Sequence, residues 1–356
     1  MPLLWVAISL TALGLGGCDQ GEPALDTSRG PALHVVATFP APGTGTDCQS
    51  APNCEGVPLN TDIELRFDRY LDPASAIRQS VLLYSTTPDG AIFLQPEYDV
   101  IERVVRFRLF ENDRLQPSTL YTFEFVTPTD DSSGGFRAFD GAPIEAGDVP
   151  LKFNFFTGTA DETKPAEPAV PDCRQILNLF RGDRAGCSGC HVSTPEGRGG
   201  CDPGQAPDPS TGECIAVPRQ GLDLSTLTGV ERTALNQVAH QTQIGPNADT
   251  PLENPGRVGV QMPIIDQQRP ENSYMMYKLL RNESNFIDGA APGTSNYRVA
   301  LPGGNLAPDA AERDRLREWF VRLDPMPAQG FSLELSELRA LQAWIRAGAD
   351  LDACKP

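Results

Sequence analysis

The stretch Asn60-Thr61-Asp62-Ile63-Glu64-Leu65-Arg66-Phe67-Asp68 alternates apolar and charged residues with a period of two. Successive side chains of a β-strand point to opposite faces, so this pattern predicts a strand with one buried and one wet face. Similar patterns predict further strands near 34–38, 81–85, 105–109, 121–125 and 151–155. With six or seven strands separated by turns rich in Pro, Gly and Asp, residues 32–158 are predicted to form an all-β antiparallel sandwich.

Several motifs of this region resemble a bacterial Ig-like domain (SbsA-type) of the kind found in surface and envelope proteins. The matching motifs are the stretch quoted above, Leu71-Asp72-Pro73, the segment 115–121 and the closing Phe155-Phe156-Thr157-Gly158. The region carries no carboxylate pair, nucleophile or ligand cluster that rises above background. The resemblance therefore implies a spacer or a docking surface, and not a site of chemistry.

A second stretch, Cys187-Ser188-Gly189-Cys190-His191, has the pattern by which a c-type haem is attached. The two sulfurs form thioethers with the haem vinyl groups, and the histidine supplies an axial nitrogen to the iron. The alternatives are a disulfide between the two cysteines or another metal site, which would need two more Cys or His at ligand spacing. We therefore expect one covalent haem c at Cys187 and Cys190, with His191 as an iron ligand.

From residue 172 onward the apolar residues follow the period of helices. Five helices are predicted, one leading from 172 to the haem motif and the others at 225–241, 271–281, 308–323 and 336–347. Ser336 is the expected N-cap of the last helix. A Pro-rich, charged stretch at 159–171 predicts an extended, solvated linker ahead of them. The chain is thus expected to be multidomain, with an all-β Ig-like sandwich followed by an all-α cytochrome c-like domain at 172–356.

The iron of such a haem needs a second axial ligand or an open position. Met326 lies just before the last predicted helix, and its thioether would complete a His/Met site with a raised reduction potential. The other candidates are His240, which would give a bis-histidine haem of lower potential, and Met262, Met275 and Met276. Packing is the expected role of Met275 and Met276, because they lie inside a predicted helix.

The segments around Met326 resemble the cytochrome-c-like domains of planctomycete and myxobacterial envelope proteins. The matching residues are Ser273, Tyr274, Lys278, Leu279, Met326, Pro327, Gly330, Leu335, Ser336, Trp344, Ile345, Gly348 and Ala349. The resemblance implies that Met326 is the distal ligand of the haem iron. The chain departs from the pattern at 282–322, which separate motifs that usually follow one another. Nothing local in the sequence therefore fixes the approach of His191 to Met326.

The N-terminus has the features of an export signal. Residues 2–15 are apolar and uncharged, too short to span a bilayer, and they lead to Leu15-Gly16-Gly17-Cys18. This tetrapeptide resembles a lipobox, although no Lys or Arg precedes the apolar run. The resemblance implies a lipoprotein signal peptide at 1–17, a lipid on Cys18 and a polar tether at 18–31. We expect a lipid-anchored protein of the cell envelope, on the periplasmic or cell-surface side.

Six cysteines remain after one is assigned to lipid and two to haem. They are Cys48, Cys54, Cys173, Cys201, Cys214 and Cys354. An even number outside the cytoplasm predicts disulfides, and six cysteines allow fifteen pairings. Proximity in sequence favours Cys48 with Cys54 and Cys201 with Cys214, which leaves Cys173 for Cys354.

The formal net charge of the 356 residues is -18. This charge disfavours nucleic acid and anionic lipid surfaces, and it suits a basic protein partner or simple solubility. The sequence as a whole predicts a membrane-tethered electron carrier with redox protein partners and no enzymatic activity of its own. The alternatives are a peroxidase-like haem enzyme and a surface-binding or sensor lipoprotein whose Ig-like domain docks a partner.

Overall fold

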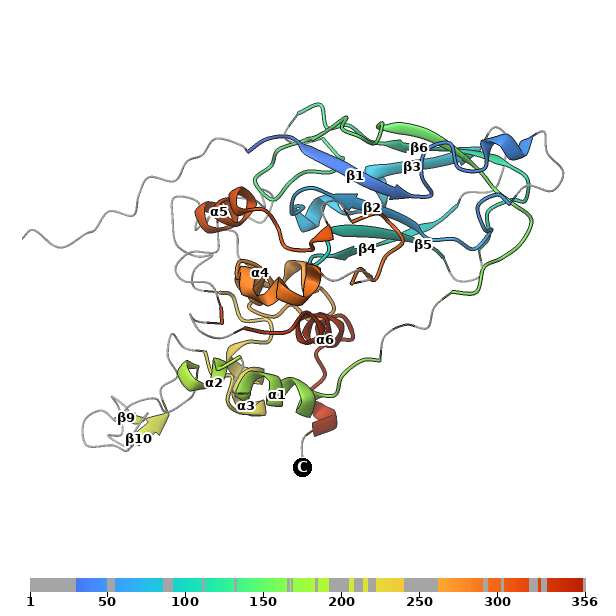
Figure 1. The fold of residues 1–356 in the computed structure, drawn as a ribbon. Helices are drawn as coiled ribbons and strands as arrows, with labels where there is room; N and C mark the ends of the chain where they lie inside the picture. Colours follow the sequence, from blue (N-terminus) through green and yellow to red (C-terminus); the bar gives the residue numbers. More distant parts are fainter. Residues whose placement is uncertain are drawn as a thin grey trace, which may run out of the picture.

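The computed structural model describes a β-rich part, a set of helices and the segments that join them (Figure 1). The described residues are 30–49, 55–85, 92–110, 113–130, 133–164, 167, 169–182, 185–191, 205–207, 214–216, 222–239, 262–290, 294–301, 304–319, 326–327 and 332–354. The expected signal peptide, Cys18, Cys54, Cys201 and His240 lie outside these residues. Within them, no helix has the length and apolar character that crossing a membrane requires.

The larger sheet has five strands in the order β4-β5-β2-β1-β7. Its strands are β1 Leu33–Phe39, β2 Ile63–Phe67, β4 Leu94–Asp99, β5 Val104–Leu109 and β7 Ile144–Glu145. Pairing is antiparallel except between β1 and β7. The smaller sheet has the order β3-β6-β8, with β3 Val81–Ser85, β6 Leu120–Phe125 and β8 Lys152–Phe156.

The two sheets share an apolar core rich in phenylalanine. Phe107 of the larger sheet meets Phe123 of the smaller one with ring centroids 6.4 Å apart, and Phe136 packs against Phe67 at 5.0 Å. Such tilted and edge-to-face contacts are the preferred geometry of buried aromatic rings. The prediction of an N-terminal all-β sandwich is confirmed.

Two strands of the larger sheet were not predicted. Strand β4 contains Pro96 and lacks a clean alternation, and β7 has only two residues. Because β4 is an edge strand, a proline without an N–H group is tolerated there.

The prediction of one wet face is wrong for β2. All five of its residues are buried, including Glu64 and Arg66. The reason is that part of the helical region covers this face of the sheet: the segment 294–301 supplies partners to both charged side chains. The charged residues Glu64 and Arg66, which alternate with the apolar residues of β2, therefore face the helical region and not solvent.

Among the described residues, six α-helices follow the sandwich. They are α1 Cys173–Arg181, α2 Cys187–Cys190, α3 Leu227–Thr233, α4 Tyr274–Leu280, α5 Ala310–Trp319 and α6 Leu335–Arg346. A short hairpin joins β9 Gln205–Pro207 to β10 Cys214–Ala216. The 3-10 helices are η1 Thr46–Gln49, η2 Pro73–Ser75, η3 Arg78–Ser80, η6 Pro270–Asn272, η7 Glu283–Ala290 and η9 Asp352–Cys354. In Figure 1, α4 and α6 lie between the larger sheet and the group α1–α3.

Each of the five predicted helices has a counterpart, but the ends differ. The last helix begins at Leu335, and Glu334 is its N-cap in a capping box with Glu337, so the prediction of Ser336 as N-cap is wrong. The carboxylate of Glu334 serves because it can accept an N–H as a serine hydroxyl would. Helix α1 is capped in the same reciprocal way by Asp172 and Gln175.

The predicted linker is not simply solvated chain. Glu162 forms a bidentate ion pair with Arg298, and Lys164 pairs with Asp62 beside β2. Glu167 pairs with Arg108 of β5. Three charged residues of this stretch therefore form ion pairs, two with the sandwich and one with Arg298 of the helical region.

Candidate functional site

The cysteine–histidine stretch forms a single helical turn directly after α1. Gly186 precedes it with a φ of 59°, a left-handed conformation in which glycine carries no steric cost, and this turns the chain from α1 into α2. Cys187 and Cys190 are the first and last residues of α2. Residues three apart in a helix lie on one side of it, so the turn presents both positions toward the same space.

His191 is held at both sides of its peptide unit. Its N–H donates to the Cys187 carbonyl at 2.8 Å, and its own carbonyl accepts from the Leu224 N–H at 2.7 Å. The side chain of His191 is half-buried, as is that of Cys187, which packs against the main apolar core. The side chain of Cys190 is not among those described. The main chain of the motif is thus fixed where a ligand histidine would need it.

The segment that receives His191 is itself braced by Asp223. Its carboxylate accepts from the N–H and the hydroxyl of Ser225 at 2.8 and 2.6 Å, and its N–H donates to Thr233 at 2.8 Å. Thr226 caps α3 through the Gly229 N–H. These contacts anchor the segment 223–233, whose first residues are bonded to the His191 carbonyl.

Met326 and Pro327 form a short bend whose main chain is bonded to α4 and to the residues that follow it. Its N–H donates to the Lys278 carbonyl at 3.2 Å, and its carbonyl accepts from the Asn285 side chain at 3.4 Å. The Pro327 carbonyl accepts from Asn282 at 3.2 Å. The side chain of Met326 is half-buried and packs against the main core.

The main chain of His191 is bonded to Leu224, and that of Met326 is bonded to Lys278 of α4. The pairing of His191 with Met326 stays a prediction. The other described methionines, Met262, Met275 and Met276, are buried in the main core. Their burial fits the packing role expected for the two that lie in α4.

The cysteines outside the motif are placed as follows. Cys173, the first residue of α1, is joined by a disulfide to Cys354 of η9, with their Cα atoms 6.1 Å apart. This is the pair expected from the sequence once Cys48 is assigned to Cys54 and Cys201 to Cys214. Cys48 belongs to η1 and Cys214 to β10, and their expected partners lie outside the described residues. The disulfide fixes the start of α1 to the chain that follows α6.

The residues present fit a covalent haem. A helical turn places the two thiol positions on one side, the imidazole follows at once on a fixed main chain, and the donor set is the one that haem attachment uses. Within the described residues, no three side chains of His, Cys, Asp or Glu converge to hold a bare metal ion.

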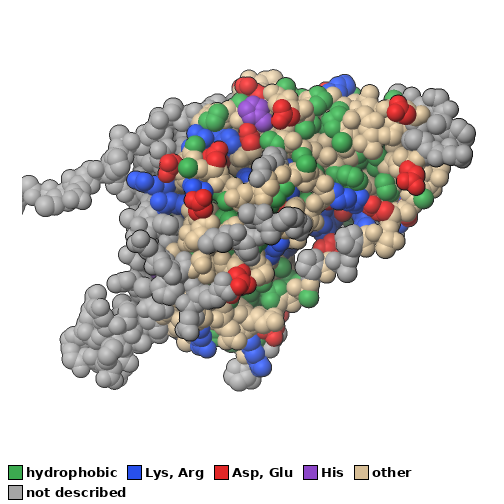
Figure 2. All heavy atoms as spheres, viewed as in Figure 1, with side chains coloured by type: hydrophobic (Ala, Val, Ile, Leu, Met, Phe, Trp, Pro, Cys, Tyr) green, Lys and Arg blue, Asp and Glu red, His purple; other side chains and the backbone are tan. Residues whose placement is uncertain are grey.

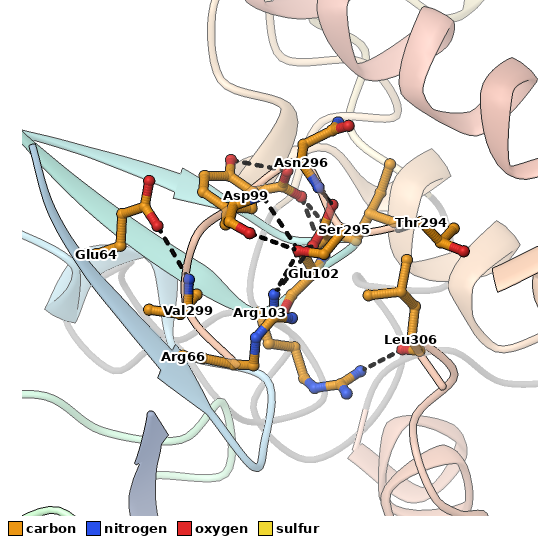
Figure 3. A network of polar contacts seen from close by, with 12 residues as sticks. Glu64, Arg66, Asp99, Glu102, Arg103, Thr294, Ser295, Asn296, Val299 and Leu306 are labelled. Carbon is orange, nitrogen blue, oxygen red and sulfur yellow. Dashed lines mark hydrogen bonds and ion pairs between the residues drawn. The ribbon is translucent and has the colours of Figure 1, made fainter. Parts of the chain in front are cut away.

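A buried polar network, which the sequence did not reveal, joins the sandwich to the helical region (Figure 3). Its centre is Glu102, a fully buried residue in the turn between β4 and β5. The Glu102 carboxylate accepts from Arg66 at 3.1 Å and from the Ser295 hydroxyl at 2.6 Å. It also accepts from the Asn296 N–H at 2.9 Å and from Arg339 of α6 at 2.6 Å. Four donors from three parts of the chain thus converge on one buried carboxylate.

Neighbouring carboxylates bind the same segment. Glu64 accepts from the N–H groups of Arg298 and Val299 at 2.7 and 3.2 Å, and Asp99 accepts from the Tyr297 hydroxyl at 2.9 Å. Burial raises the pKa of Glu64, and the two N–H donors oppose that rise. We call the segment 294–301 the strap, since it runs across β2 and β5 with its main chain bound to the sandwich.

A second set of contacts docks α4 and α5. Buried Glu312 of α5 accepts from Arg69 at 3.0 Å and from the Tyr70 N–H at 2.9 Å. The Tyr70 ring meets Tyr277 of α4 edge to face at 6.0 Å. One continuous core of buried residues runs through the sandwich and these helices.

The visible surface does not show a large region of one charge. On the face seen in Figure 2, Lys and Arg side chains are interspersed with Asp and Glu. Mixed charges of this kind favour solubility more than binding to a polyanion.

Comparison with known proteins identifies the N-terminal domain. Residues 31–154 match the family model of the bacterial Ig-like domain. Among solved structures, the N-terminal part of the bacterial S-layer protein SbsC matches at 15% identity and a TM-score of 0.23, over 39% of this chain and 25% of that chain. Domains 1–6 of surface layer protein SbsC match at 15% identity and a TM-score of 0.24, over 39% and 15%.

The matched segment spans a quarter or less of each of those two S-layer chains. A search of curated proteins returns no match. The match to the family model and the two-sheet architecture agree, and they support the expected Ig-like N-terminal domain: residues 31–154 are similar to a bacterial Ig-like domain.

Proposed function

We propose that this chain is a c-type cytochrome of the cell envelope, which carries single electrons and has no enzymatic activity of its own. The observation that carries the proposal is the stretch 187–191, folded as one helical turn with its histidine fixed at the end. Cys187 and Cys190 would bind one haem c, and His191 and Met326 would be its axial ligands. When bound, the haem would supply an iron that changes its charge by one electron.

The chain's own part is to hold the group, orient its ligands and keep water away. The contacts to Cys187 and Leu224 limit how the His191 imidazole can move. Buried Ile176 and Phe180 of α1 supply apolar surface in the helix that packs against α2. An apolar setting and a thioether ligand both favour the reduced form of a haem, as suits an electron carrier.

The surroundings of this site complete the proposal. Residues 172–356 would be a cytochrome c-like domain with an unusual strap, and the partners would be redox proteins of the envelope and not nucleic acid. The lipobox-like sequence before Cys18 and the oxidising compartment that a disulfide needs both support an exported, lipid-anchored protein. A haem bound covalently is useful there because it is not lost by dissociation.

The first test is attachment. The full chain is expressed with a cytochrome maturation system, and haem staining of the denatured protein is combined with a reduced-minus-oxidised spectrum. The parent and Ser188→Ala, the matched control within the same turn, are expected to stain. Cys187→Ser/Cys190→Ser is expected to be colourless. Colourless parent protein with an intact disulfide between these two cysteines would end the proposal.

The second test concerns the axial thioether. Met326→Ala is expected to remove the band near the red edge of the ferric spectrum that marks methionine ligation. Met262→Leu is the control, since it changes another buried methionine and is expected to keep the band. A band that persists in Met326→Ala would show that Met326 is not the ligand, while leaving haem attachment intact. Peroxide turnover by the parent would favour the enzyme alternative.

A further inference from the structure

Asn285 is fully buried in η7 and all of its side-chain polar atoms are used. Its Nδ2 group donates to the Leu279 carbonyl at 3.0 Å and to the Met326 carbonyl at 3.4 Å. Its Oδ1 atom accepts from the Leu333 N–H at 2.9 Å. Because the two carbonyls can only accept and the N–H can only donate, the chemistry of the partners fixes the orientation of this amide.

These three bonds join parts of the chain that are distant in sequence. Leu279 is in the last turn of α4, Met326 precedes Pro327, and Leu333 lies two residues before α6. The neighbouring Asn282 binds the next carbonyl along, that of Pro327. Two asparagine side chains therefore hold successive carbonyls of the Met326 turn, while the Met326 N–H is held by Lys278.

A buried amide is a poor way to stabilise a core. It gains little over water and costs free energy if any partner is missing, whereas an apolar residue of the same size would pack without that requirement. Its advantage is directional: it fixes the position of the groups that it binds. What Asn285 fixes is the main chain from which the Met326 side chain extends.

We propose that Asn285 is a positioning residue for Met326, which holds the turn so that the thioether is presented in one place. The role of Met326 toward the iron rests on the proposed function. The hydrogen bonds by which Asn285 and Asn282 hold its main chain, which we call the clamp, do not. A thioether is a weak iron ligand. Motion of the Met326 main chain would therefore lower the fraction of haem iron that carries this ligand. In the same way, groups that orient metal ligands affect metal sites without touching the metal.

The decisive variant is Asn285→Asp in the full chain. It keeps the size and the acceptor for Leu333, and it places an oxygen against the two carbonyls that now accept N–H groups. Val230→Ala is the matched control, because Val230 is buried in α3, away from the turn, and its truncation also lowers stability. Both variants are compared at equal fractions folded.

The first readout needs no haem. The folded chain is treated briefly with dilute peroxide, and sulfoxide formation is measured at each methionine by mass spectrometry. In Asn285→Asp the oxidation of Met326, relative to Met262 of the same chain, is expected to rise about tenfold, since losing hydrogen bonds to a buried turn raises local opening by that order. Val230→Ala is expected to leave the ratio at the parent value. A ratio that is unchanged in Asn285→Asp, or that rises equally in both variants, would overturn the proposal.

The second readout uses haem-loaded protein. As pH is raised, the methionine band of the parent is lost at some midpoint, and Asn285→Asp is expected to lower that midpoint by about one unit. Val230→Ala is expected to keep it. A parent without haem, or a methionine band that survives in Met326→Ala, would count against the proposed function. The oxidation of Met326 relative to Met262 would still test whether Asn285 holds the Met326 main chain.

Discussion

The helical region is held in two different ways. Its docked half, residues 262–346, is fastened to the sandwich by buried carboxylates that bind arginines and main-chain N–H groups of the opposite part. Its attachment half, residues 172–239, carries His191 and is held by apolar packing of α1 and α2, by the disulfide of Cys173, and by main-chain hydrogen bonds between 234–239 and 262–265. The half rich in polar contacts is the one next to the β-sheet (Figure 1).

The difference suggests a division of labour between the halves. Directional buried contacts fix position, and the docked half contains Met326 and the asparagines that hold its turn. The attachment half contains the residues that would be bonded to haem. In the proposed cytochrome the iron would therefore be bonded to both halves, and haem loading would add a link to the main-chain hydrogen bonds that already join 234–239 to 262–265. The Ig-like domain then acts as the base on which one ligand is positioned, and not as a free spacer.

Glu102→Ala is expected to break the docked half most severely. It removes one buried carboxylate and leaves Arg66 and Arg339 without the group that compensates their charge. The free energy of unfolding is expected to fall by about 4 kcal/mol, the usual scale for removing one partner of a buried ion pair. Denaturant titration followed by tryptophan fluorescence measures this.

The matched control lies on the exposed face of the smaller sheet. Lys152→Gln removes an ion pair with Glu124 that is open to solvent, and it is expected to leave the unfolding midpoint unchanged. If Glu102→Ala were as harmless as this control, the network would not be what fastens the two parts.

The attachment half should depend on its disulfide. Cys173→Ala/Cys354→Ala removes a link across 181 positions of sequence. A loss of about 3 kcal/mol is expected, the middle of the usual range for a disulfide. Hydrogen exchange should show the loss of protection mainly in α1, with β2 little changed. Uniform loss across both halves would contradict the distinction between them.

Asp72 should make the sandwich beneath α4 sensitive to pH. It is 7% exposed, and burial raises its pKa to about 7, against the opposing effects of the Ala74 N–H and Arg137. The folded state thus binds the proton more tightly than the unfolded chain, so stability is lost as pH rises from about 4 to about 7. Above that window Asp72→Asn is expected to be more stable than the parent by about 1–2 kcal/mol.

The measurement for Asp72 is the unfolding free energy at pH 4, 6 and 8. The parent and Asp72→Asn should be most alike at the lowest pH, where the carboxyl is protonated in the folded state and about half protonated in the unfolded state. A variant that is less stable than the parent at pH 8 would show that Asp72 is ionised favourably in the fold.

The smallest effect is expected at the start of α1. Asp172→Ala removes the side-chain acceptor for the Gln175 N–H, which is one of the two hydrogen bonds of the capping box. A loss of about 1 kcal/mol is usual for an N-cap. Asp172→Asn keeps the acceptor and should recover most of it, as thermal unfolding would show; equal losses in both variants would point to charge, and not capping.

Local patterns in the sequence predicted most of the β-elements. Alternation located β2, β5, β6 and β8 because the core side of each strand is apolar at every second position. Strand β4 was missed because Pro96 and its polar neighbours obscure that alternation. Helix ends were less predictable, since α6 is capped by a glutamate that the usual N-cap preferences rank low.

The interface could not be predicted in this way. Glu64 and Arg66 occupy the positions at which an isolated sandwich meets water, and only partners more than 200 positions later make them buried residues. The motif at 187–191 was visible because its chemistry is local. The Met326 turn was visible only through a resemblance, and Asn285 not at all, because what it binds is assembled from three separate segments.

The contact between Arg66 and Ser295 joins residues 229 positions apart, both committed to the same buried carboxylate. A substitution at either position is tolerated only if the other can still complete that site. Replacing one of the two parts alone would therefore leave polar groups of the other part buried without their partners. Although residues 31–154 match the family model of a bacterial Ig-like domain, in this chain the sandwich and the strap complete one buried polar site between them.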